Sequence, residues 1–480
     1  MAQRSRRDTY LCRTRTRAQR SVGVAALLCA LVLAGCSTVP AYRTPDVALP
    51  PQWTSTKETA PPATEPIEWW TELRSPRLNE LVARGLGDGL DVTIALARLE
   101  QARGMAQIAG AGRYPTLGVG ADVSRGSTNS SSGKRSLTLQ GSLNLDLWGA
   151  SGAKAKSADM TVQASESDLA TARQTLASNI ALGYLQLLAL DERILLATRI
   201  ADDAQNLLSL VEKQASLGAA STLDVQQQRN AVQTFLAAIP VLRLQRDTVF
   251  GQLAVLVNET PQQFTVARQS LLDVAVPQVQ AIAPADAVAA RPEVQAAEAR
   301  LEAANFDVGV ARAAFLPAAS ITAQTGWLLN PTAALWSIAG SVLQPLFDGG
   351  QREGQLRVDR AHAEELVASY RQVILQVLQE TETQLVAVQR LHEAETLDAA
   401  AVDSASESLR LSRIRFERGA SDLLTVIINE RTLYQAQDTL LQARLQRLQA
   451  TVGLYRALGG RAPAQQLAVA TPSQAQPNTK

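Results

Sequence analysis

The chain is poor in the residues that build enzyme sites and disulfide frameworks. Its 480 residues include only three cysteines, two histidines and 4% aromatic residues. Cys12 and Cys29 fall in an N-terminal leader, so only Cys36 remains in the mature chain. A single cysteine excludes a disulfide framework and a thiolate metal site. We expect neither a metal nor another cofactor.

The histidines and the usual motifs of catalysis give no sign of an enzyme. His362 and His392 lie within a helical heptad pattern, where a solvated or packed histidine is much commoner than a ligand. The sequence has no glycine-rich phosphate loop, no metal-ligand spacing and no nucleophile motif. We predict that the protein has no catalytic residues and is not an enzyme.

Proline is missing from two long stretches, one between Pro115 and Pro240 and the other between Pro345 and Pro463. Because proline breaks helix interiors, its absence permits very long helices. We expect continuous helices over 150 to about 217 and over 351 to about 418, each about 100 Å long at about 1.5 Å per residue. Two apolar stripes on the second helix require two neighbouring helices, as in a closed ring.

The first 35 residues resemble a lipoprotein signal peptide. Arginines dominate the first twenty residues, and an uncharged, mostly apolar run from Val22 to Gly35 follows. This run is too short to cross a bilayer as a helix, which needs roughly twenty residues. Leu33-Ala34-Gly35-Cys36 resembles the lipobox of bacterial lipoproteins, which predicts lipidation of Cys36. An ordinary signal peptide with a chance cysteine is the alternative.

The mature chain has neither a basic patch nor an excess of positive charge. Without the seven arginines and one aspartate of the leader, 39 basic and 44 acidic residues remain, and the net charge is about −5. This balance argues against a nucleic-acid partner. Ser37 beside the cysteine, as in enteric lipoproteins, favours sorting to the outer membrane, whose lipid would hold the acylated N-terminus.

The sequence repeats itself after about two hundred residues. Ala97-Arg98-Leu99-Glu100 recurs as Ala299-Arg300-Leu301-Glu302 at an offset of 202, and Gly218-Ala219 recurs as Gly419-Ala420 at an offset of 201. A repeat of this size indicates two equivalent halves with one architecture.

The repeat and the composition together predict six segments. They are a signal peptide (1–35), a lipidated, proline-rich extended strap (36–74), a first repeat (75–258), a connector (259–284), a second repeat (285–460) and a disordered tail (461–480). Within the repeats we expect strands at about 115–148 and 316–347, and helical hairpin tips at about 217–225 and 418–426.

The expected strands alternate between apolar and polar or small residues. The pattern is clear over 117–123, 137–147 and 319–327, and weaker in the return strand over about 335–347. Each strand has about ten residues, the span of a tilted transmembrane β-strand. Trp148, Trp327 and Trp336 lie at or near strand ends, where an interfacial aromatic belt would place them. On the strands alone, half-buried soluble hairpins are equally compatible.

Capping signals mark the two hairpin tips. Gly218 and Gly419 end the long helices, and Ser221-x-x-Asp224 predicts a capping box for the first return helix. Ser421 or Asp422 can cap the second return helix. Pro240 lies inside the first return helix and predicts a kink or break there.

Four amphipathic strands per chain cannot close a barrel. An open sheet edge in lipid leaves backbone groups unpaired, so other copies must supply the closure. Small bacterial barrels begin at about eight strands, so at least two chains are needed, and three chains would supply twelve strands. The polar set of side chains would then line a wet lumen, with the ring of long helices in line beneath it.

Several motifs resemble the TolC-like outer-membrane efflux family, and the lipobox resembles its lipoprotein branch, of which the NodT and OprM types are representatives. The matching motifs are Arg291-Pro292-Glu293-Val294, Phe315-Leu316-Pro317, Gln344-Pro345-Leu346-Phe347-Asp348-Gly349-Gly350 and the paired hairpin tips. The resemblance implies a homotrimer with a twelve-stranded β-barrel in the outer membrane of a Gram-negative bacterium and a periplasmic α-helical barrel. It also implies an exit duct that docks a periplasmic adaptor linked to an inner-membrane transporter.

The resemblance places the functional end at the hairpin tips. Asp422 and Arg418 are candidates for closing the aperture, although helix capping and satisfaction of the last helix carbonyls are their alternative roles. The expected adaptor contacts are Leu217, Gly218, Ser221, Leu223, Asp224, Gly419, Ser421 and Leu424. For Asp224 we favour capping.

Two other functions remain open from the sequence. One is a periplasmic coiled-coil adaptor or scaffold lipoprotein without a channel, but a single hairpin beside a β-rich module would be typical of that class. The other is the outer-membrane duct of a type I secretion system. The sequence is nearly silent about the cargo.

Overall fold

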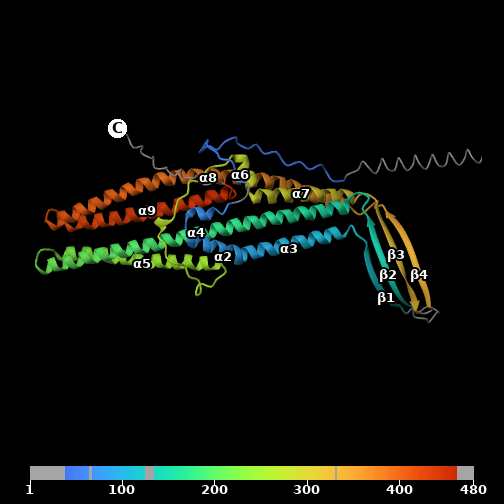
Figure 1. Ribbon diagram of the computed structural model, residues 1–480, viewed down its shortest axis with the longest axis horizontal. Coiled ribbons are helices and arrows are strands. Elements are labelled where there is room, and N and C mark those ends of the chain that lie inside the picture. The colour runs from blue at the N-terminus through green and yellow to red at the C-terminus, as the bar shows by residue number, and fades with distance from the viewer. Residues whose placement is uncertain (1–37, 64–66, 125–133, 330–331, 462–480) are drawn as a thin grey trace, which may run out of the picture. The chain divides into compact units, whose positions relative to one another are not determined.

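The structure, a computed structural model, describes residues 38–63, 67–124, 134–329 and 332–461 (Figure 1). The predicted signal peptide, Cys36 and nearly all of the predicted disordered tail lie outside these residues. The helical elements are η1 (Trp69–Leu73), α2 (Pro76–Asp88), α3 (Leu90–Ala111), α4 (Ala150–Ser216), α5 (Thr222–Leu256), η2 (Leu271–Asp273), α6 (Pro284–Ala290), α7 (Pro292–Ala313), α8 (Gln351–Glu417) and α9 (Leu423–Ala457). The strands are β1 (Thr116–Ser124), β2 (Lys134–Leu145), β3 (Ala318–Leu329) and β4 (Thr332–Leu343).

The order of these elements confirms the twofold internal repeat. Each half of the chain contributes an antiparallel strand pair, a 67-residue helix and a 35-residue return helix. Each of the 67-residue helices is about 100 Å long at about 1.5 Å per residue. Among the described residues, no helix has both the length and the apolar character of a candidate membrane span.

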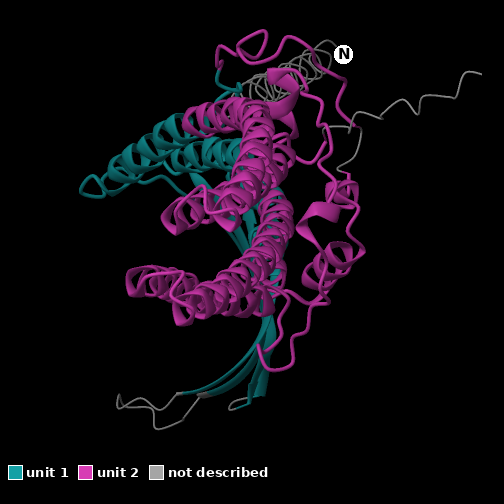
Figure 2. Cartoon of the chain, turned by 90° about the vertical axis from the view of Figure 1, so that its left-hand side faces the viewer, with its two compact units in different colours: residues 1–45, 99–165, 296–370 teal, residues 46–98, 166–295, 371–480 magenta. Residues whose placement is uncertain are grey.

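The chain divides into two compact units, coloured teal and magenta in Figure 2. Unit 1 comprises residues 1–45, 99–165 and 296–370 and contains the four strands. Unit 2 comprises residues 46–98, 166–295 and 371–480 and contains both helical hairpin tips.

Unit 1 contains a four-stranded antiparallel sheet in the order β1-β2-β3-β4. Leu139 of β2 stands opposite Val119 of β1 and Thr325 of β3, and Thr325 stands opposite Trp336 of β4. Directly paired residues share a face, and successive residues alternate between faces. The odd-numbered residues of β1, β2 and β3 therefore share one face with the even-numbered residues of β4.

This shared face is apolar and exposed in the single chain. Val123 is 78% exposed and Trp336 79% exposed. The opposite face carries mostly hydroxyl and amide side chains, namely Thr138, Gln140, Ser142, Asn144, Ser320, Thr322 and Gln324. Leu335 and Leu343 also fall on this second face, which accounts for the weaker alternation of β4. The register thus separates an apolar from a largely polar surface.

The start of the strap lies against α7 and one end of the sheet. The Thr38 hydroxyl donates to the main-chain oxygen of Trp148 (3.2 Å), and the Trp148 indole Nε1 donates to the main-chain oxygen of Pro317 (2.7 Å). Val39 passes so close to Gly309 of α7 that a Cβ at Gly309 would lie 2.6 Å from its side chain. Glycine at this position lets the strap lie directly on the helix.

In unit 2 the first long helix packs against its own return helix. The core between α4 and α5 consists of buried apolar residues, including Ala197, Ile200, Ala204, Leu208, Val232, Phe235 and Ile239. Tyr434 of α9 packs edge-to-face on Phe235 with 5.8 Å between the ring centroids. Arg193 of α4 pairs with Asp438 of α9, with 2.6 Å between Nε and Oδ1. An aromatic pair and an ion pair therefore join the two hairpins.

The later part of the strap is tied to the connector and to α8. Trp53 is buried, and its indole donates to the main-chain oxygen of Ile282 (2.7 Å). The Glu382 carboxylate accepts hydrogen bonds from the amides of Thr54 (3.0 Å) and Ser55 (2.8 Å). These bonds satisfy backbone donors that an extended segment cannot satisfy within itself.

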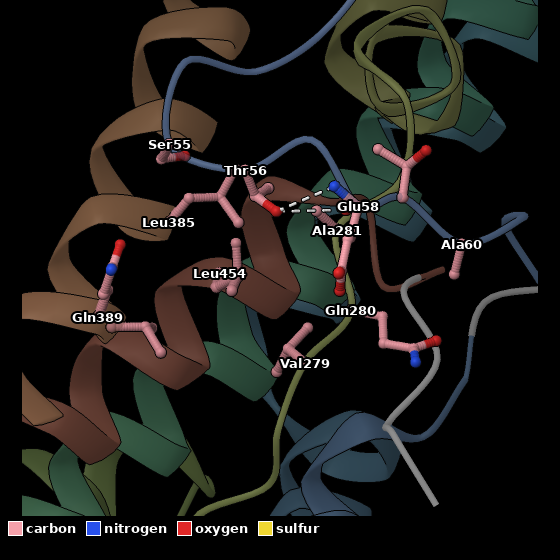
Figure 3. Close-up of a pocket in the computed structure, with 12 residues that line it drawn as sticks. Ser55, Thr56, Glu58, Ala60, Val279, Gln280, Ala281, Leu385, Gln389 and Leu454 are labelled. Carbon is pink, nitrogen blue, oxygen red and sulfur yellow. Dashed lines mark hydrogen bonds between the residues drawn. The ribbon is translucent and has the colours of Figure 1, made fainter.

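A cavity of about 610 Å³ lies beneath this part of the strap (Figure 3). Thr56 and Glu58 form a turn at its rim, and the Ala60 amide donates to the oxygen of Ala281 (2.7 Å). Leu385 of α8 lies on the wall of the cavity. The strap is held at points on both sides of this space, so it bridges the space without filling it.

Arg291 of the Arg-Pro-Glu-Val motif is buried and joins three helices. Its guanidinium pairs with Glu293 (3.0 Å) and with Glu380 of α8 (3.0 Å), and donates to the main-chain oxygen of Arg456 of α9 (3.1 Å). Desolvation raises the pKa of Glu380, but hydrogen bonds and charges from Arg456 and Arg291 outweigh it and hold the pKa below the usual range. The charged carboxylate fixes the start of α7 to α8 and α9.

Two local features differ from the expectations. α5 runs unbroken through Pro240, which is exposed, so the helix does not break there. Pro240 still removes one hydrogen bond from the helix. Residues 69–73, expected to be part of an extended strap, form the helix η1. Trp69 is buried there and stacks on Tyr455 with 5.7 Å between the ring centroids. Aromatic packing therefore overrides the extended preference of the proline-rich strap.

Candidate functional site

Each hairpin turns at a glycine in the left-handed conformation. φ is 75° at Gly218 and 71° at Gly419. The amide of the following alanine donates back to the fifth residue before it at 2.8 Å in both tips. This is the Schellman arrangement, which satisfies helix carbonyls and favours glycine at the turn. Both tips therefore share one backbone motif.

Side-chain caps start both return helices. The Asp224 amide donates to Ser221 Oγ (3.2 Å), and the Ser221 amide donates to Asp224 Oδ2 (2.8 Å), so the predicted capping box is confirmed. In the second hairpin the N-cap of α9 is Asp422, not Ser421. Asp422 Oδ1 accepts from the Thr425 amide (2.9 Å).

Asp422 combines capping with an exposed negative charge. Hydrogen bonds from the Thr425 hydroxyl and amide lower the pKa of this carboxyl below its usual value. Both of these bonds go to Oδ1. The carboxylate is therefore charged at neutral pH, and Oδ2 is available to a cation, so the capping role is compatible with the predicted aperture role.

Arg418 is exposed at the second tip, and within the described part of the chain its side chain has no hydrogen bond or ion pair. Arg415 instead donates to the main-chain oxygen of Ala420 (3.3 Å). Ala420 lies in the turn after α8, so within the described residues the Arg418 side chain bonds none of the last helix carbonyls, the alternative role considered for it.

The predicted adaptor-contact residues separate into two groups. Ser221, Asp224 and the two glycines shape the turns, as described above. The leucines are exposed, with Leu217 at 77%, Leu223 at 64% and Leu424 at 46%. Leu223 and Leu424 line one groove between α5 and α9, whereas Leu217 lies outside it.

Two ion pairs near the tips, one in each hairpin, were not predicted from the sequence. Glu212 of α4 accepts from Arg229 of α5 at 2.9 Å, and Arg413 of α8 donates to Glu430 of α9 at 2.7 Å. Positions 212 and 229 match 413 and 430 at the repeat offset of 201. The two hairpins therefore carry the same ion pair with the charges exchanged, and the offset itself could have revealed it.

Glu430 is fully buried, unlike its counterpart in the first hairpin. Desolvation raises the pKa of its carboxyl, and the charge of Asp203 raises it further, against the lowering effect of Arg413. Oε2 of Glu430 has no hydrogen-bond partner among the described residues. A buried acceptor without a partner lowers stability.

Of the three tryptophans, Trp327 and Trp336 lie near one end of the sheet and Trp148 lies at the other. Trp327 (58% exposed) and Trp336 (79% exposed) share the apolar face near the β3–β4 turn. Trp148 follows β2 and is half-buried, with its indole bonded to Pro317 just before β3. Their interfacial role stays a prediction.

No metal cluster is present among the described residues, where no group of three or more histidine, cysteine, aspartate or glutamate side chains is placed to hold an ion. His362 is exposed, with Nδ1 3.3 Å from Glu365 Oε2.

Known proteins share this architecture over most of its length. A sequence profile described as "Outer membrane efflux protein" matches residues 86–259 and 283–460. The chain is 34% identical over 449 residues to the pyoverdine export outer membrane protein OpmQ of Pseudomonas aeruginosa, covering 90% of this chain and 95% of that protein. It is 26% identical over 448 residues to the cation efflux system protein CusC of Escherichia coli K12, covering 90% of this chain and 97% of that protein. The solved structure of the outer-membrane channel OprN matches with a TM-score of 0.81 and 27% identity, covering 88% of this chain and 99% of OprN.

The fold and the sheet define an outer-membrane channel of the trimeric class, with a twelve-stranded β-barrel and a helical barrel. The chain belongs to the outer membrane efflux protein family. It is thus an efflux channel of the outer membrane and a component of a tripartite pump, not an enzyme.

Proposed function

We propose that this protein is the lipid-anchored exit duct of its pump, a homotrimer whose hairpin tips dock a periplasmic adaptor and, through it, an energised inner-membrane transporter. One observation carries the proposal. The same chain has a sheet with one apolar and one largely polar face, and two hairpin tips that expose leucines. The apolar face would contact outer-membrane lipid. The polar face would line the path of the cargo.

The strap supports the lipid anchor. Thr38 is bonded to Trp148 at the end of β2, and Cys36 precedes Thr38 by two residues. Two extended residues reach about 7 Å, so acyl chains on Cys36 would start close to the end of the sheet. Mass spectrometry of the mature N-terminus tests this, and Cys36→Ser should lose the acyl mass while the barrel keeps the protein in the membrane fraction. An unmodified cysteine would contradict the anchor.

The second tip supports a role in aperture gating. Asp422 is exposed and charged, and Arg418 lies exposed four residues before it. Threefold symmetry would bring three copies of each around one axis. A ring of carboxylates attracts cations and repels anions.

The eight tip residues would contribute to adaptor contact in different ways. Gly218, Gly419, Ser221 and Asp224 give the turns their shape, Ser421 precedes the N-cap Asp422, and the leucines supply apolar surface. Exposed apolar side chains at a tip are suited to a protein partner. Co-purification of the full-length channel with the adaptor of its pump tests this, and Leu223→Asp should lose the adaptor while the trimer stays intact. A trimer that never retains an adaptor would contradict the function.

The cargo is best assigned through the partner proteins. Relatives with the same architecture are named for pyoverdine export, cation efflux and toluene efflux. The shared duct therefore serves chemically different cargoes, and we place selection in the inner-membrane transporter. An antiporter gene with an adaptor gene beside this one would support small-molecule efflux, whereas an ATP-driven exporter gene would support type I secretion.

A further inference from the structure

The cavity of about 610 Å³ beneath the strap combines an apolar floor with polar edges. Val279, Leu385 and Val388 are half-buried in its lining and pack against a buried apolar cluster. Gln280 and Gln389 lie at its edges (Figure 3). The apolar side chains are only partly covered by the protein around them, so an occupant of the cavity would bury them further.

The lining of the cavity is nearly uncharged. Among the described residues that form it, Glu58 alone is charged, and this residue is exposed. The other polar groups are the hydroxyls of Ser55, Thr56 and Thr59 and the glutamine amides, which both donate and accept hydrogen bonds. These groups suit a neutral peptide segment better than a charged ligand.

The C-terminal end of the described chain lies beside this cavity. The Ile67 amide donates to the oxygen of Gly460 (2.8 Å), and the Ala63 amide donates to the oxygen of Arg461 (2.9 Å). Successive residues of the C-terminal end thus bond strap residues of decreasing number, which directs the chain beyond Arg461 toward Ala60. Ala60 lines the cavity and is three residues from Ala63, which is at most about 11 Å.

The sequence beyond Arg461 matches the chemistry of the cavity. Residues 462–479, which lie outside the described part of the chain, include no charged residue, so their entry buries no charge. Leu467 and Val469 are the only large apolar residues among them, and in an extended chain both point to the same side. Six extended residues span about 20 Å, so Leu467 can reach the cavity from Arg461.

We infer that residues 465–469 of the same chain bind in this cavity, with Leu467 and Val469 on the apolar floor and the main chain hydrogen-bonded to Gln280 and Gln389. A segment that is disordered by itself can become ordered when it binds, so the inference is compatible with the composition of the tail. The bound segment holds the strap, and with it the proposed lipid anchor, against α8. The inference does not depend on the proposed exit-duct function.

Cysteine cross-linking in the full-length channel tests the inference. The double variant Gln389→Cys, Leu467→Cys pairs the edge of the cavity with its inferred occupant, and mild oxidation should join the tryptic peptides 372–390 and 462–480, as mass spectrometry detects. The matched control is Gln389→Cys, Gln476→Cys, whose tail cysteine lies nine residues further along. The control should cross-link at least tenfold more slowly. Similar rates for the two pairs would overturn the inference.

Hydrogen exchange measures the same contact without a cross-link. Relative to an unstructured peptide of the same sequence, the amides of residues 466–469 should exchange at least tenfold more slowly than those of residues 474–476. Leu467→Asp would place a charge on the apolar floor, so it should abolish this difference. Ala475→Asp adds the same charge outside the segment and should leave the difference unchanged.

The gel mobility of the cross-linked protein identifies which chain supplies the segment. A disulfide within one chain keeps the mobility of a monomer in a denaturing gel, and we expect this result. Disulfide-linked dimers would assign the cavity to the tail of a neighbouring chain and overturn the inference. Equal exchange along the whole wild-type tail would also overturn it. Each of these outcomes leaves the exit-duct function standing.

Discussion

Arg413 and Glu430 form an ion pair, 2.7 Å between Nη2 and Oε1, in which the carboxylate is fully buried. The matching pair of the first hairpin, Glu212 with Arg229, has the charges exchanged and both side chains more than 40% exposed. The same pair of positions thus forms an ion pair twice, once with a buried carboxylate and once exposed to solvent. Breaking each pair tests how environment sets the strength of an ion pair.

Arg413→Ala should lower the free energy of unfolding by about 3 kcal/mol, because it leaves a buried carboxylate unpaired. Arg229→Ala should change it by less than about 0.5 kcal/mol, since exposed pairs contribute little. Guanidinium unfolding of the detergent-solubilised protein, followed by circular dichroism, measures both. Equal losses in the two variants would show that burial of Glu430 is not the deciding factor.

Glu430 should also make stability depend on pH. Burial raises its folded-state pKa, so above the ordinary glutamate value of about 4.3 the native state keeps a proton that the unfolded chain has lost. Stability from this group is therefore present at low pH and is lost as pH rises through the folded-state pKa. Arg413 and Asp203 are the charged groups that act on it.

The matched variant is Glu430→Gln, which keeps the side-chain shape and removes the titration. The difference in thermal midpoint between wild type and variant should shift in favour of the variant as pH rises from the ordinary glutamate pKa of about 4.3 through the raised folded-state pKa. A constant difference over this range would contradict a raised pKa for Glu430.

Adjacent residues of β2 test the two faces of the sheet. Leu139 lies on the apolar face and Gln140 on the polar face, near the middle of the strand. Leu139→Arg should destabilise the inserted barrel by about 2 to 4 kcal/mol, the cost of a lipid-facing arginine near the bilayer midplane. Gln140→Arg should leave the yield of trimer in outer-membrane fractions unchanged and shift single-channel selectivity toward anions. Equal loss of trimer in both variants would contradict the assignment of faces.

Asp422→Asn tests the aperture. Asparagine keeps the N-cap of α9 and removes the charge, so the fold should persist. Planar-bilayer recordings should show a cation-to-anion permeability ratio at least twofold lower than that of the wild type. Because hydrogen bonds lower the pKa of Asp422, the wild-type preference should hold below pH 7 and fade only as pH falls through that lowered value. Unchanged conductance and cation preference would remove Asp422 from the gate.

Much of the fold was predictable because its signals are local. The capping box of Ser221 and Asp224 needs four consecutive residues, and the turn at Gly218 needs one residue type. The alternation of apolar with polar or small residues likewise lies within each of the strands β1, β2 and β3. Because the chain repeats, such signals recur at matching positions in the two halves, and each occurrence supports the other.

The rest depends on partners distant in sequence. Helix η1 forms because Trp69 stacks on Tyr455 from the other end of the chain. α5 continues through the exposed Pro240, although a proline inside a helix favours a break. At the tips, Leu223 and Leu424 come together only because α5 and α9 pack, so the groove was not foreseen.

In the proposed assembly, sister chains close one water-filled duct through the sheet and the long helices. The most direct test is to reconstitute the full-length, purified protein in planar bilayers and to determine its mass by native mass spectrometry. We expect a trimer that inserts and gives discrete, ohmic current steps. A monomer that neither inserts nor passes current would contradict it.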